Sequence, residues 1–348
     1  MSDPLVRATD LVRSYRARGG RFRAVDDVSL QINSGETLGL VGESGSGKST
    51  VGRLLIGMEP ADHGSIDFDG KNLGRMRGRE RKRLRRDAAM VFQDPYSALD
   101  PRWTIERVVA EPLVVAGVPS AERHERVLKA LTLVGLAEEH LTRRPREFSG
   151  GQRQRIAVAR ALVSEPKLIV CDESVSALDV STQAQVLGLL EDLQDRLGVA
   201  YLFISHDLHV IRRVSDRVAV MYLGRIIEEG PADDVVADPR HPYTAALVSA
   251  SPIPDPKLAR SNRRIILSGS PPSPMDPPSG CVFRSRCPLA MPVCAEERPG
   301  WTEIAPGRRV ACHLYANPDL APRAHGVADL MRAATPSSTL KKKELKEQ

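Results

Sequence analysis

A glycine-rich segment at residues 42–50 (GESGSGKST) constrains this chain more than any other feature of its sequence. It has the spacing G-x-x-x-x-G-K-[ST], follows an apolar run at 37–41 and precedes a helix-like pattern at 51–58. Glycine tolerates positive φ, and successive N–H groups at a helix N-terminus form a concave site that suits a phosphate. The segment therefore predicts a nucleotide-binding loop. The residues expected to contact the nucleotide are Gly42, Ser44, Gly45, Gly47, Lys48, Ser49 and Thr50.

The side chains at the end of this loop have distinct expected roles. Lys48 would reach the β- and γ-phosphates, the Ser49 hydroxyl would bind Mg²⁺, and Thr50 would support the α-phosphate side. The alternative is a glycine-rich turn with a chance lysine, which the strand–loop–helix context disfavours. The loop predicts a nucleotide binder, but not what the nucleotide is used for.

Length, composition and charge limit the class of protein. The chain has 348 residues, 41% of them hydrophobic, which suits about two globular domains. No stretch approaches the roughly 18 consecutive apolar residues of a membrane span, and the N-terminus lacks a signal-peptide core. We therefore expect a cytosolic protein whose membrane role, if any, requires a partner that spans.

The net charge of +6 raises the question of a nucleic-acid partner. Most of the local excess lies at residues 75–86 (RMRGRERKRLRR), where no aromatic residues interleave for base stacking. A solvated helix face with long basic side chains is the favoured interpretation of this segment.

Strands and helices alternate from residue 36 to residue 222, which predicts an α/β fold. Residues 5–32 predict two antiparallel strands joined by a loop, and 97–165 predict a helical insertion. From Pro231 onward a short helix at 241–250, a Pro- and Ser-rich linker and a cysteine-containing module follow. The expected core strands are 37–41, 88–93, 168–171, 200–204, 217–222 and 225–229, and the main helices are 51–58, 149–163 and 181–197.

Four polar side chains stand at the carboxyl ends of predicted strands, where ligands bind in open α/β sheets. Asp172 can hold Mg²⁺ through its water shell, and Glu173 can orient an attacking water or accept its proton. His206 can donate a hydrogen bond to the γ-phosphate, and Gln93 can contact the metal or the water. Together with Lys48 these residues predict one hydrolytic crevice.

The segment 148–155 (FSGGQRQR) narrows the class further. Its adjacent glycines at a helix N-terminus form a second anion site, distant in sequence from the phosphate loop. Two such sites suggest composite sites shared by a dimer.

With these motifs in place, the sequence resembles the ATP-binding subunits of ABC transporters. The resemblance rests on the phosphate loop, Gln93, the signature at 149–152, LIVCDE at 168–173, SALD at 176–179 and His206. It implies a RecA-like P-loop NTPase core, ATP and Mg²⁺ as cofactors, and two subunits that sandwich two ATP molecules head to tail. It also implies adenine stacking by Tyr15, for which composition alone favours an edge-strand residue. The nucleotide contacts that the resemblance adds are Ser149, Gly150, Gly151, Gln152 and Asp179.

A narrower resemblance covers nearly the whole chain. FQDPYSALDPR, VSALDVS, HPYTAALVSASP and the pattern CxFxxRCP…GxxVACHL look like the oligopeptide/dipeptide (and nickel) importer ATPases. Phe148 stands where Leu is commoner and Ser174 where Pro is usual, but neither departure removes a catalytic group. The expected domains are an ATP-binding domain at 1–255, a peptide-transporter-type C-terminal domain at 256–318 and a disordered tail at 319–348.

This resemblance implies an ATPase that energises peptide import from the cytoplasmic face of the membrane. Its expected partners are two transmembrane permease subunits, an identical or paralogous ATPase subunit and, through the permease, an extracytoplasmic peptide-binding protein. The loop 94–102 would face the permease, with Tyr96 and Leu99 as coupling residues. Neither the peptide preference, nor nickel as the alternative substrate, follows from the sequence.

A soluble ABC ATPase acting on nucleic acid or ribosomes is the alternative, motivated by the positive charge. Such proteins usually carry two fused cassettes or a coiled-coil insertion, whereas this chain shows one signature and neither insertion. No nucleic-acid partner is therefore expected.

Four cysteines near the C-terminus have the spacing C-x5-C-x6-C-x17-C: Cys281, Cys287, Cys294 and Cys312. A short Pro-rich segment has poor means of building an apolar core, so a metal centre is predicted to stabilise it. Disulfides are disfavoured in a reducing cytosol, and four unligated thiols remain an alternative. The wide spacing favours a [4Fe–4S] cluster narrowly over Zn²⁺. Cys171 lies in a predicted buried strand and is excluded from the site.

Overall fold

The computed structural model describes residues 3–94, 98–176, 178–250, 264–316 and 326–330. The expected domain boundary at 255/256 and the candidate coupling residue Tyr96 lie outside these residues. Within the expected tail, residues 326–330 are helical and Val327 is buried, and the rest of the tail lies outside the described residues. No helix in the described ranges is long and apolar enough to cross a membrane.

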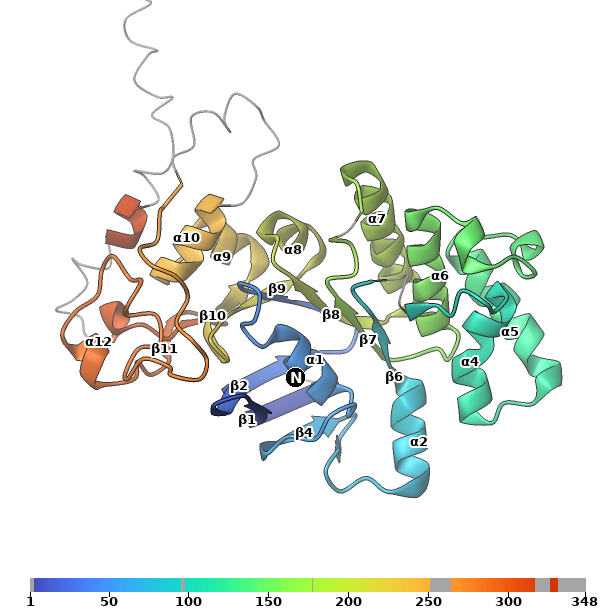
Figure 1. Ribbon diagram of the computed structural model, residues 1–348, viewed down its shortest axis with the longest axis horizontal. Coiled ribbons are helices and arrows are strands. Elements are labelled where there is room, and N and C mark those ends of the chain that lie inside the picture. Colours follow the sequence, from blue (N-terminus) through green and yellow to red (C-terminus); the bar gives the residue numbers. More distant parts are fainter. Residues whose placement is uncertain (1–2, 95–97, 177, 251–263, 317–325, 331–348) are drawn as a thin grey trace, which may run out of the picture.

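An eight-stranded sheet forms the centre of the molecule (Figure 1), in the order β11-β12-β10-β9-β3-β8-β7-β6. Strands β6, β7, β8, β3 and β9 run parallel to one another, and β10, β12 and β11 continue the sheet from β9 in antiparallel pairs. The parallel strands are short apolar runs buried on both faces, as predicted. The bounds are β3 Thr37–Val41, β6 Ala88–Val91, β7 Leu168–Asp172, β8 Ala200–Ser205, β9 Arg217–Tyr222, β10 Arg225–Pro231, β11 Thr302–Ala305 and β12 Arg308–Val310.

A smaller antiparallel sheet, in the order β2-β1-β4-β5, packs beside the phosphate-loop helix α1 (Lys48–Leu55) (Figure 1). Its first two strands confirm the antiparallel pair predicted for residues 5–32. The hairpin register places Tyr15 opposite Phe22. The bounds are β1 Val6–Ala17, β2 Gly20–Ile32, β4 His63–Phe68 and β5 Lys71–Asn72.

Two hydrophobic cores lie on opposite faces of the large sheet. Along β7, Leu168 and Val170 enter the core shared with α1 and the small sheet, whereas Ile169 and Cys171 enter the core shared with the other helices. This alternation follows from the two-residue period of a strand. Cys171 is fully buried there, as expected, and takes no part in the C-terminal cysteine group.

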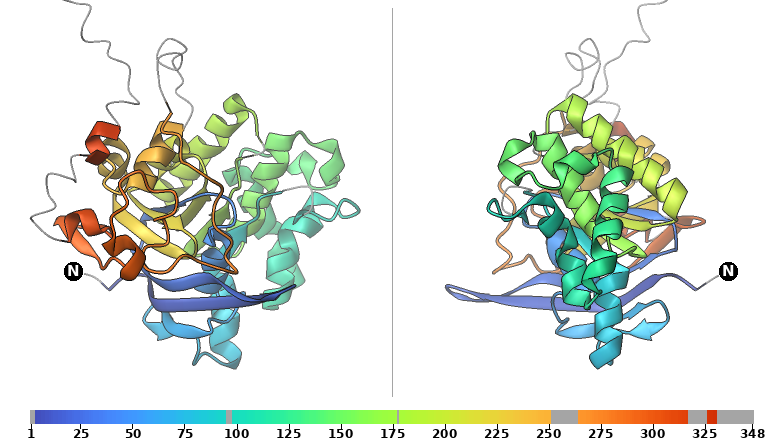
Figure 2. Two further views of the ribbon diagram at one scale, coloured as in Figure 1. Left: turned by 60° about the vertical axis from the view of Figure 1, so that its left-hand side comes forward. Right: turned by 90° about the vertical axis from the view of Figure 1, so that its right-hand side faces the viewer.

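The region predicted as a helical insertion contains helices α4, α5 and α6, which lie on the right-hand side of Figure 1 and face the viewer in Figure 2, right. Thr104 caps α4 by accepting a hydrogen bond from the Arg107 N–H, and Ser149 caps α6 in the same way through Gln152. The basic segment at 75–86 contributes the mostly exposed helix α2, in line with the favoured interpretation. The bounds are α2 Gly78–Asp87, α4 Ile105–Ala116, α5 Ser120–Leu133, η1 Glu138–His140, η2 Pro145–Glu147 and α6 Gly150–Leu162.

The remaining helices cover the sheet or belong to the C-terminal part: α7 Val180–Leu197, α8 Leu208–Val214, α9 Ala232–Ala237, α10 Pro242–Ala250, α12 Val293–Glu296 and η3 His313–Tyr315. Of these, α8, α9, α12 and η3 were not predicted, because helices of three to seven residues are too short to show a clear period.

The C-terminal part does not depend on a core of its own, contrary to the reasoning that led to the metal prediction. Strand β12 pairs with β10 and so extends the large sheet. Phe283 is fully buried and packs against Tyr222 and Tyr243, which belong to β9 and α10. The segment therefore shares the core of the preceding residues. Its short strands were missed in the sequence because they show no run of alternating residues.

Candidate functional site

The phosphate loop joins β3 to α1 as predicted, but α1 begins at Lys48, three residues earlier than the apolar pattern at 51. Gly47 has φ 106°, and a Cβ there would lie 2.0 Å from the Ala24 carbonyl oxygen, so only glycine fits. The Lys48 ammonium donates hydrogen bonds to the carbonyls of Gly42 (2.8 Å) and Glu43 (2.9 Å). Burial lowers the pKa of Lys48, because a charged ammonium is costly away from water. A bound phosphate would stabilise the charged form of this side chain.

The two residues expected to bind Mg²⁺ lie in contact. The Ser49 hydroxyl donates a hydrogen bond of 2.7 Å to the Asp172 carboxylate, although 123 residues separate them. Burial raises the pKa of Asp172, because a charged carboxylate is costly away from water. Mg²⁺ prefers hard oxygen ligands, and these two residues supply a hydroxyl and a carboxylate. A bound Mg²⁺ would also offset the cost of keeping the Asp172 carboxylate charged away from water.

Glu173 lies at the carboxyl end of β7 and meets side chains from two neighbouring strand ends. The Gln93 amide donates to its carboxylate at 2.9 Å, and the His206 Nδ1 lies 3.7 Å from the other oxygen. The Glu173 backbone has φ 45° and donates from its N–H to the Ile204 carbonyl. Such left-handed backbone is uncommon for a non-glycine residue and is found most often at functional sites.

The phosphate loop, Gln93 and Glu173 line a pocket of about 300 Å³ that extends to the small sheet, whereas Asp172 and His206 are not among its lining residues. The structure thus brings together most of the predicted nucleotide contacts with Gln93 and Glu173. The lining is Tyr15, Phe22, Ala24, Ser44, Gly45, Gly47, Lys48, Ser49, Thr50, Gln93 and Glu173.

Tyr15 lies at the small-sheet end of this pocket. Its ring centroid is 6.0 Å from that of Phe22, and its hydroxyl donates a hydrogen bond to the Glu59 carboxylate. Phe22 and Ala24 were not predicted as lining residues. The signal was available, because Tyr15 and Phe22 are placed opposite each other once the turn of the hairpin is recognised.

The signature residues 149–152 do not line this pocket, nor does Asp179. Ser149 and Gln152 form a capping box, with hydrogen bonds of 3.3 Å and 3.0 Å between the side chain of each and the N–H of the other. Among the described residues outside its own helical turn, the nearest atom to a Cβ added at Gly150 is the Leu178 Cδ2, at 3.8 Å. Hydrogen bonds from Ser181 and Thr182 lower the pKa of Asp179, which caps α7.

Gly151 has an additional reason to be glycine that the sequence did not indicate. A Cβ at this position would lie 2.3 Å from the Thr182 Cγ2 of the same chain. Helices α6 and α7 therefore require a glycine at their contact whether or not a partner subunit is present.

The four C-terminal cysteines are close enough to influence one another electrostatically, and Cys281 donates its N–H to the Cys294 carbonyl. Burial raises the pKa of Cys281 and raises those of Cys287 and Cys312 to about 12. Among the described residues, which include all four, no group of three or more such side chains is placed to hold a metal ion. The structure therefore gives the predicted [4Fe–4S] or Zn²⁺ centre no support.

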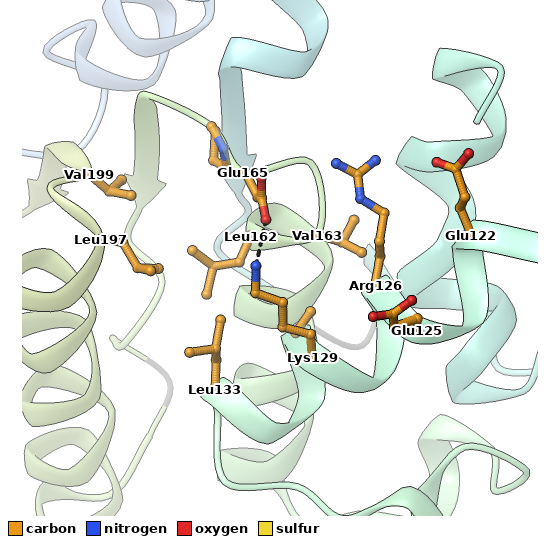
Figure 3. Close-up of a pocket in the computed structure, with 12 residues that line it drawn as sticks. Glu122, Glu125, Arg126, Lys129, Leu133, Leu162, Val163, Glu165, Leu197 and Val199 are labelled. Carbon is orange, nitrogen blue, oxygen red and sulfur yellow. Dashed lines mark hydrogen bonds and ion pairs between the residues drawn. The ribbon is translucent and has the colours of Figure 1, made fainter. Parts of the chain in front are cut away.

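A larger cleft, of about 580 Å³, lies between α5, the end of α6 and the end of α7 (Figure 3). Its charged side chains include Lys129 and Glu165, which pair at 2.8 Å, and Glu122, Glu125 and Arg126 at its side. None of its lining residues stands at the carboxyl end of a core strand, so it is not the hydrolytic site.

A phosphate loop between a buried strand and a helix, with carboxylate, amide and imidazole groups at adjacent strand ends, defines a P-loop ATPase. Comparison with known proteins narrows the class. The chain matches the ABC transporter family model over residues 25–176 and the model of the oligopeptide/dipeptide transporter C-terminal region over 227–294.

The relatives extend over most of the chain. A Bacillus subtilis protein, YkfD, provisionally named an oligopeptide transport ATP-binding protein, is 48% identical over 90% of this chain and 96% of its own length. A Brucella ovis protein provisionally named a peptide import ATP-binding protein is 51% identical over 89% and 97%. The ATP-binding cassette MJ0796, solved as a dimer in a post-hydrolysis state with ADP and Pi, has a TM-score of 0.59 and 29% identity over 65% of this chain and 98% of that one. The chain belongs to the ABC transporter ATP-binding family and is an ABC ATPase.

Proposed function

We propose that this chain is the ATP-hydrolysing subunit that energises import of oligopeptides or dipeptides across the cytoplasmic membrane. The observation that carries the proposal is the pocket that gathers Tyr15, the phosphate loop, Gln93 and Glu173. The C-terminal match and the names of the two relatives support the peptide as substrate class. Nothing in the comparisons supports the nucleic-acid alternative.

In this proposal the loop residues and Lys48 bind the phosphates of ATP, and Ser49 and Asp172 hold Mg²⁺. Bound Mg²⁺ would neutralise phosphate charge. Lys48 would exchange its hydrogen bonds to two loop carbonyls for bonds to the β- and γ-phosphates. Tyr15 would stack on the adenine.

Glu173 is proposed as the group that orients the attacking water and accepts its proton. The amide of Gln93 holds one carboxylate oxygen, and His206 lies beside the other, where it can donate to the γ-phosphate. The hydrogen bond from Gln93 favours one orientation of this carboxylate, which is what a positioned base requires.

A second copy or a paralogue would complete each site. Ser149, Gly150, Gly151, Gln152 and Asp179 would act on the nucleotide bound to the partner subunit, since they do not line the pocket of their own chain. The dimeric structure of a related cassette supports a head-to-tail sandwich.

The remaining proposed partners are two transmembrane permease subunits and, through them, an extracytoplasmic peptide-binding protein. The chain would lie at the cytoplasmic face as a peripheral subunit. A cleft of about 670 Å³ beside the loop after Gln93, lined in part by Arg102, Trp103 and Glu111, is suited to a permease segment. Leu99, expected as a coupling residue, is 1% exposed and belongs to the core, so the exposed Arg102 is the better candidate.

Purification of the chain from membranes, followed by reconstitution in proteoliposomes, tests the proposal. We expect integral membrane subunits to co-purify and peptide uptake to require ATP hydrolysis. Nucleic acid or ribosomes in place of membrane subunits would overturn it in favour of the alternative.

Metal at the four cysteines is a separate prediction, and metal analysis of anaerobically purified protein tests it. About four iron atoms per chain would identify a [4Fe–4S] cluster, and one zinc would identify a zinc site. Absence of both would leave four free thiols, buried at Cys281 and Cys294 and partly buried at Cys287 and Cys312, that stabilise the segment through packing.

A further inference from the structure

Glu43, the second residue of the phosphate loop, is held by residues from the C-terminal part of the chain. Arg286 donates from Nη1 to both oxygens of its carboxylate, at 3.1 Å and 2.9 Å. The Glu43 N–H donates to the Tyr243 hydroxyl at 2.8 Å. The carbonyl of the same residue accepts the hydrogen bond from Lys48. Glu43 therefore connects the C-terminal part directly to the lysine of the ATP site.

The groups that hold Glu43 are themselves rigidly supported. Arg286 is 9% exposed, and its N–H donates to the Phe283 carbonyl at 3.0 Å. Tyr243 is 1% exposed, and its ring packs at 4.7 Å from Tyr222, whose ring in turn lies 5.2 Å from Phe283. An aromatic cluster spanning β9, α10 and the cysteine-containing segment thus fixes both groups relative to the sheet.

The charge of Glu43 has a consequence for nucleotide binding. Its carboxylate lies in a loop that must accept the polyanionic phosphates of ATP, and an unpaired negative charge there would oppose them. Arg286 supplies the opposite charge through one nitrogen, Nη1, which donates to both carboxylate oxygens, and its side chain is largely out of water. When one member of such a pair is removed, most of the loss comes from the charge left behind.

We propose that Arg286 and Tyr243 are positioning residues for ATP binding: they hold Glu43, and with it the phosphate loop, in the nucleotide-binding conformation. Arg286 in addition neutralises Glu43 so that it does not repel the phosphates. Through this contact the C-terminal part of the chain acts on the ATP site. The inference rests on the ATP-binding part of the proposed function and not on peptide transport.

Nucleotide binding by the purified full-length chain tests this inference, with a fluorescent ATP analogue as the probe. Arg286→Met should raise the Kd roughly tenfold, because it leaves the Glu43 carboxylate unpaired. Glu43→Gln keeps one side-chain oxygen that can accept from Arg286 and carries no charge, so it should raise the Kd less than Arg286→Met does. The double variant should recover most of the affinity lost in Arg286→Met, since no unpaired carboxylate remains.

The matched control is Arg284→Met, two residues away, which should keep the wild-type Kd, because among the described residues its guanidinium donates to the carbonyl and hydroxyl of Ser279. If Arg286 acted only through its own packing and not through Glu43, the double variant would bind no better than Arg286→Met. That result, or equal losses in Arg284→Met and Arg286→Met, would overturn the inference. Failure of the wild-type chain to bind the analogue would contradict the proposed function instead.

Discussion

Glu173 is the side chain on which turnover should depend most. We predict that Glu173→Gln keeps ATP affinity near that of wild type and lowers the hydrolysis rate on the order of 10²–10⁴-fold. The amide has nearly the same shape, so the contact with Gln93 and the strained backbone at φ 45° are retained, whereas the proton-accepting carboxylate is lost. Steady-state ATPase assays and nucleotide binding measure the two effects separately.

The control for this change is Glu165→Gln. Glu165 also has a positive φ, of 51°, but pairs with Lys129 on the surface, outside the nucleotide pocket. Hydrolysis should therefore be unaffected by it. Turnover by Glu173→Gln at the wild-type rate would contradict the role proposed for this carboxylate.

We expect the buried carboxylate of Asp172 to destabilise the folded protein when no ligand is bound. Burial raises its pKa above the ordinary value of 3.8, so the penalty for the ionised form is absent below that value and is complete once pH exceeds the raised pKa. We predict that Asp172→Asn raises the Tm at pH 7 by about 2 °C and that this gain disappears as the pH falls toward 4. The same variant should lose the stabilisation that Mg²⁺ and ATP give to wild type. Thermal unfolding over this pH range, with and without Mg²⁺ and ATP, checks both effects, and a gain that persists at low pH would show another cause.

At the scale of elements, the contact between α6 and α7 depends on Gly151. A Cβ at this position meets the Thr182 Cγ2 at 2.3 Å, so we predict that Gly151→Ala destabilises the chain by about 1–3 kcal/mol. Thr182→Ser removes the clashing methyl and keeps the hydroxyl that bonds to Asp179. The double variant should therefore regain wild-type stability in chemical denaturation, helped by the better helix propensity of Ala. Equal instability of the single and double variants would show that the methyl contact is not the cause.

The sequence predicted the elements whose signals are local. Short apolar runs bounded by polar residues identified the parallel strands, and a polar residue at each strand end placed Asp172, Glu173 and His206 together. These local patterns were enough to predict the α/β fold, which the structure confirms. The resemblance to a known family supplied what spacing alone does not contain, such as Tyr15 and the signature.

The features that were missed depend on contacts between residues distant in the chain. Arg286 and Glu43 are 243 positions apart, and no period or spacing connects them. Strand β12 has only three residues and is recognisable only through its pairing with β10. The prediction that the cysteine segment needs a metal has the same cause. The segment packs against Tyr222 and Tyr243, which are distant in the chain, so the sequence alone did not show this packing.

For the whole molecule, the separation between the nucleotide pocket and residues 149–152 leads to the prediction of composite sites. Each chain carries a phosphate loop and a signature, but only the first lines its own pocket. In a head-to-tail dimer, one chain with a defective loop and one with a defective signature would together retain one intact site.

We predict that Lys48→Ala and Ser149→Arg subunits, each inactive alone, regain roughly a quarter of wild-type ATPase activity when mixed in equal amounts. Half of the randomly formed dimers are mixed, and each has one working site of two, which gives this value. Ser149 is the better choice than Gly151, whose substitution disturbs the contact with Thr182 within the chain. ATPase activity over a range of mixing ratios should peak at equal amounts if this chain forms homodimers. Analytical ultracentrifugation of the same mixtures reports whether dimers form. ATPase activity that does not change with the mixing ratio in dimeric samples would contradict composite sites. Monomers at every ratio would identify a paralogue as the natural mate.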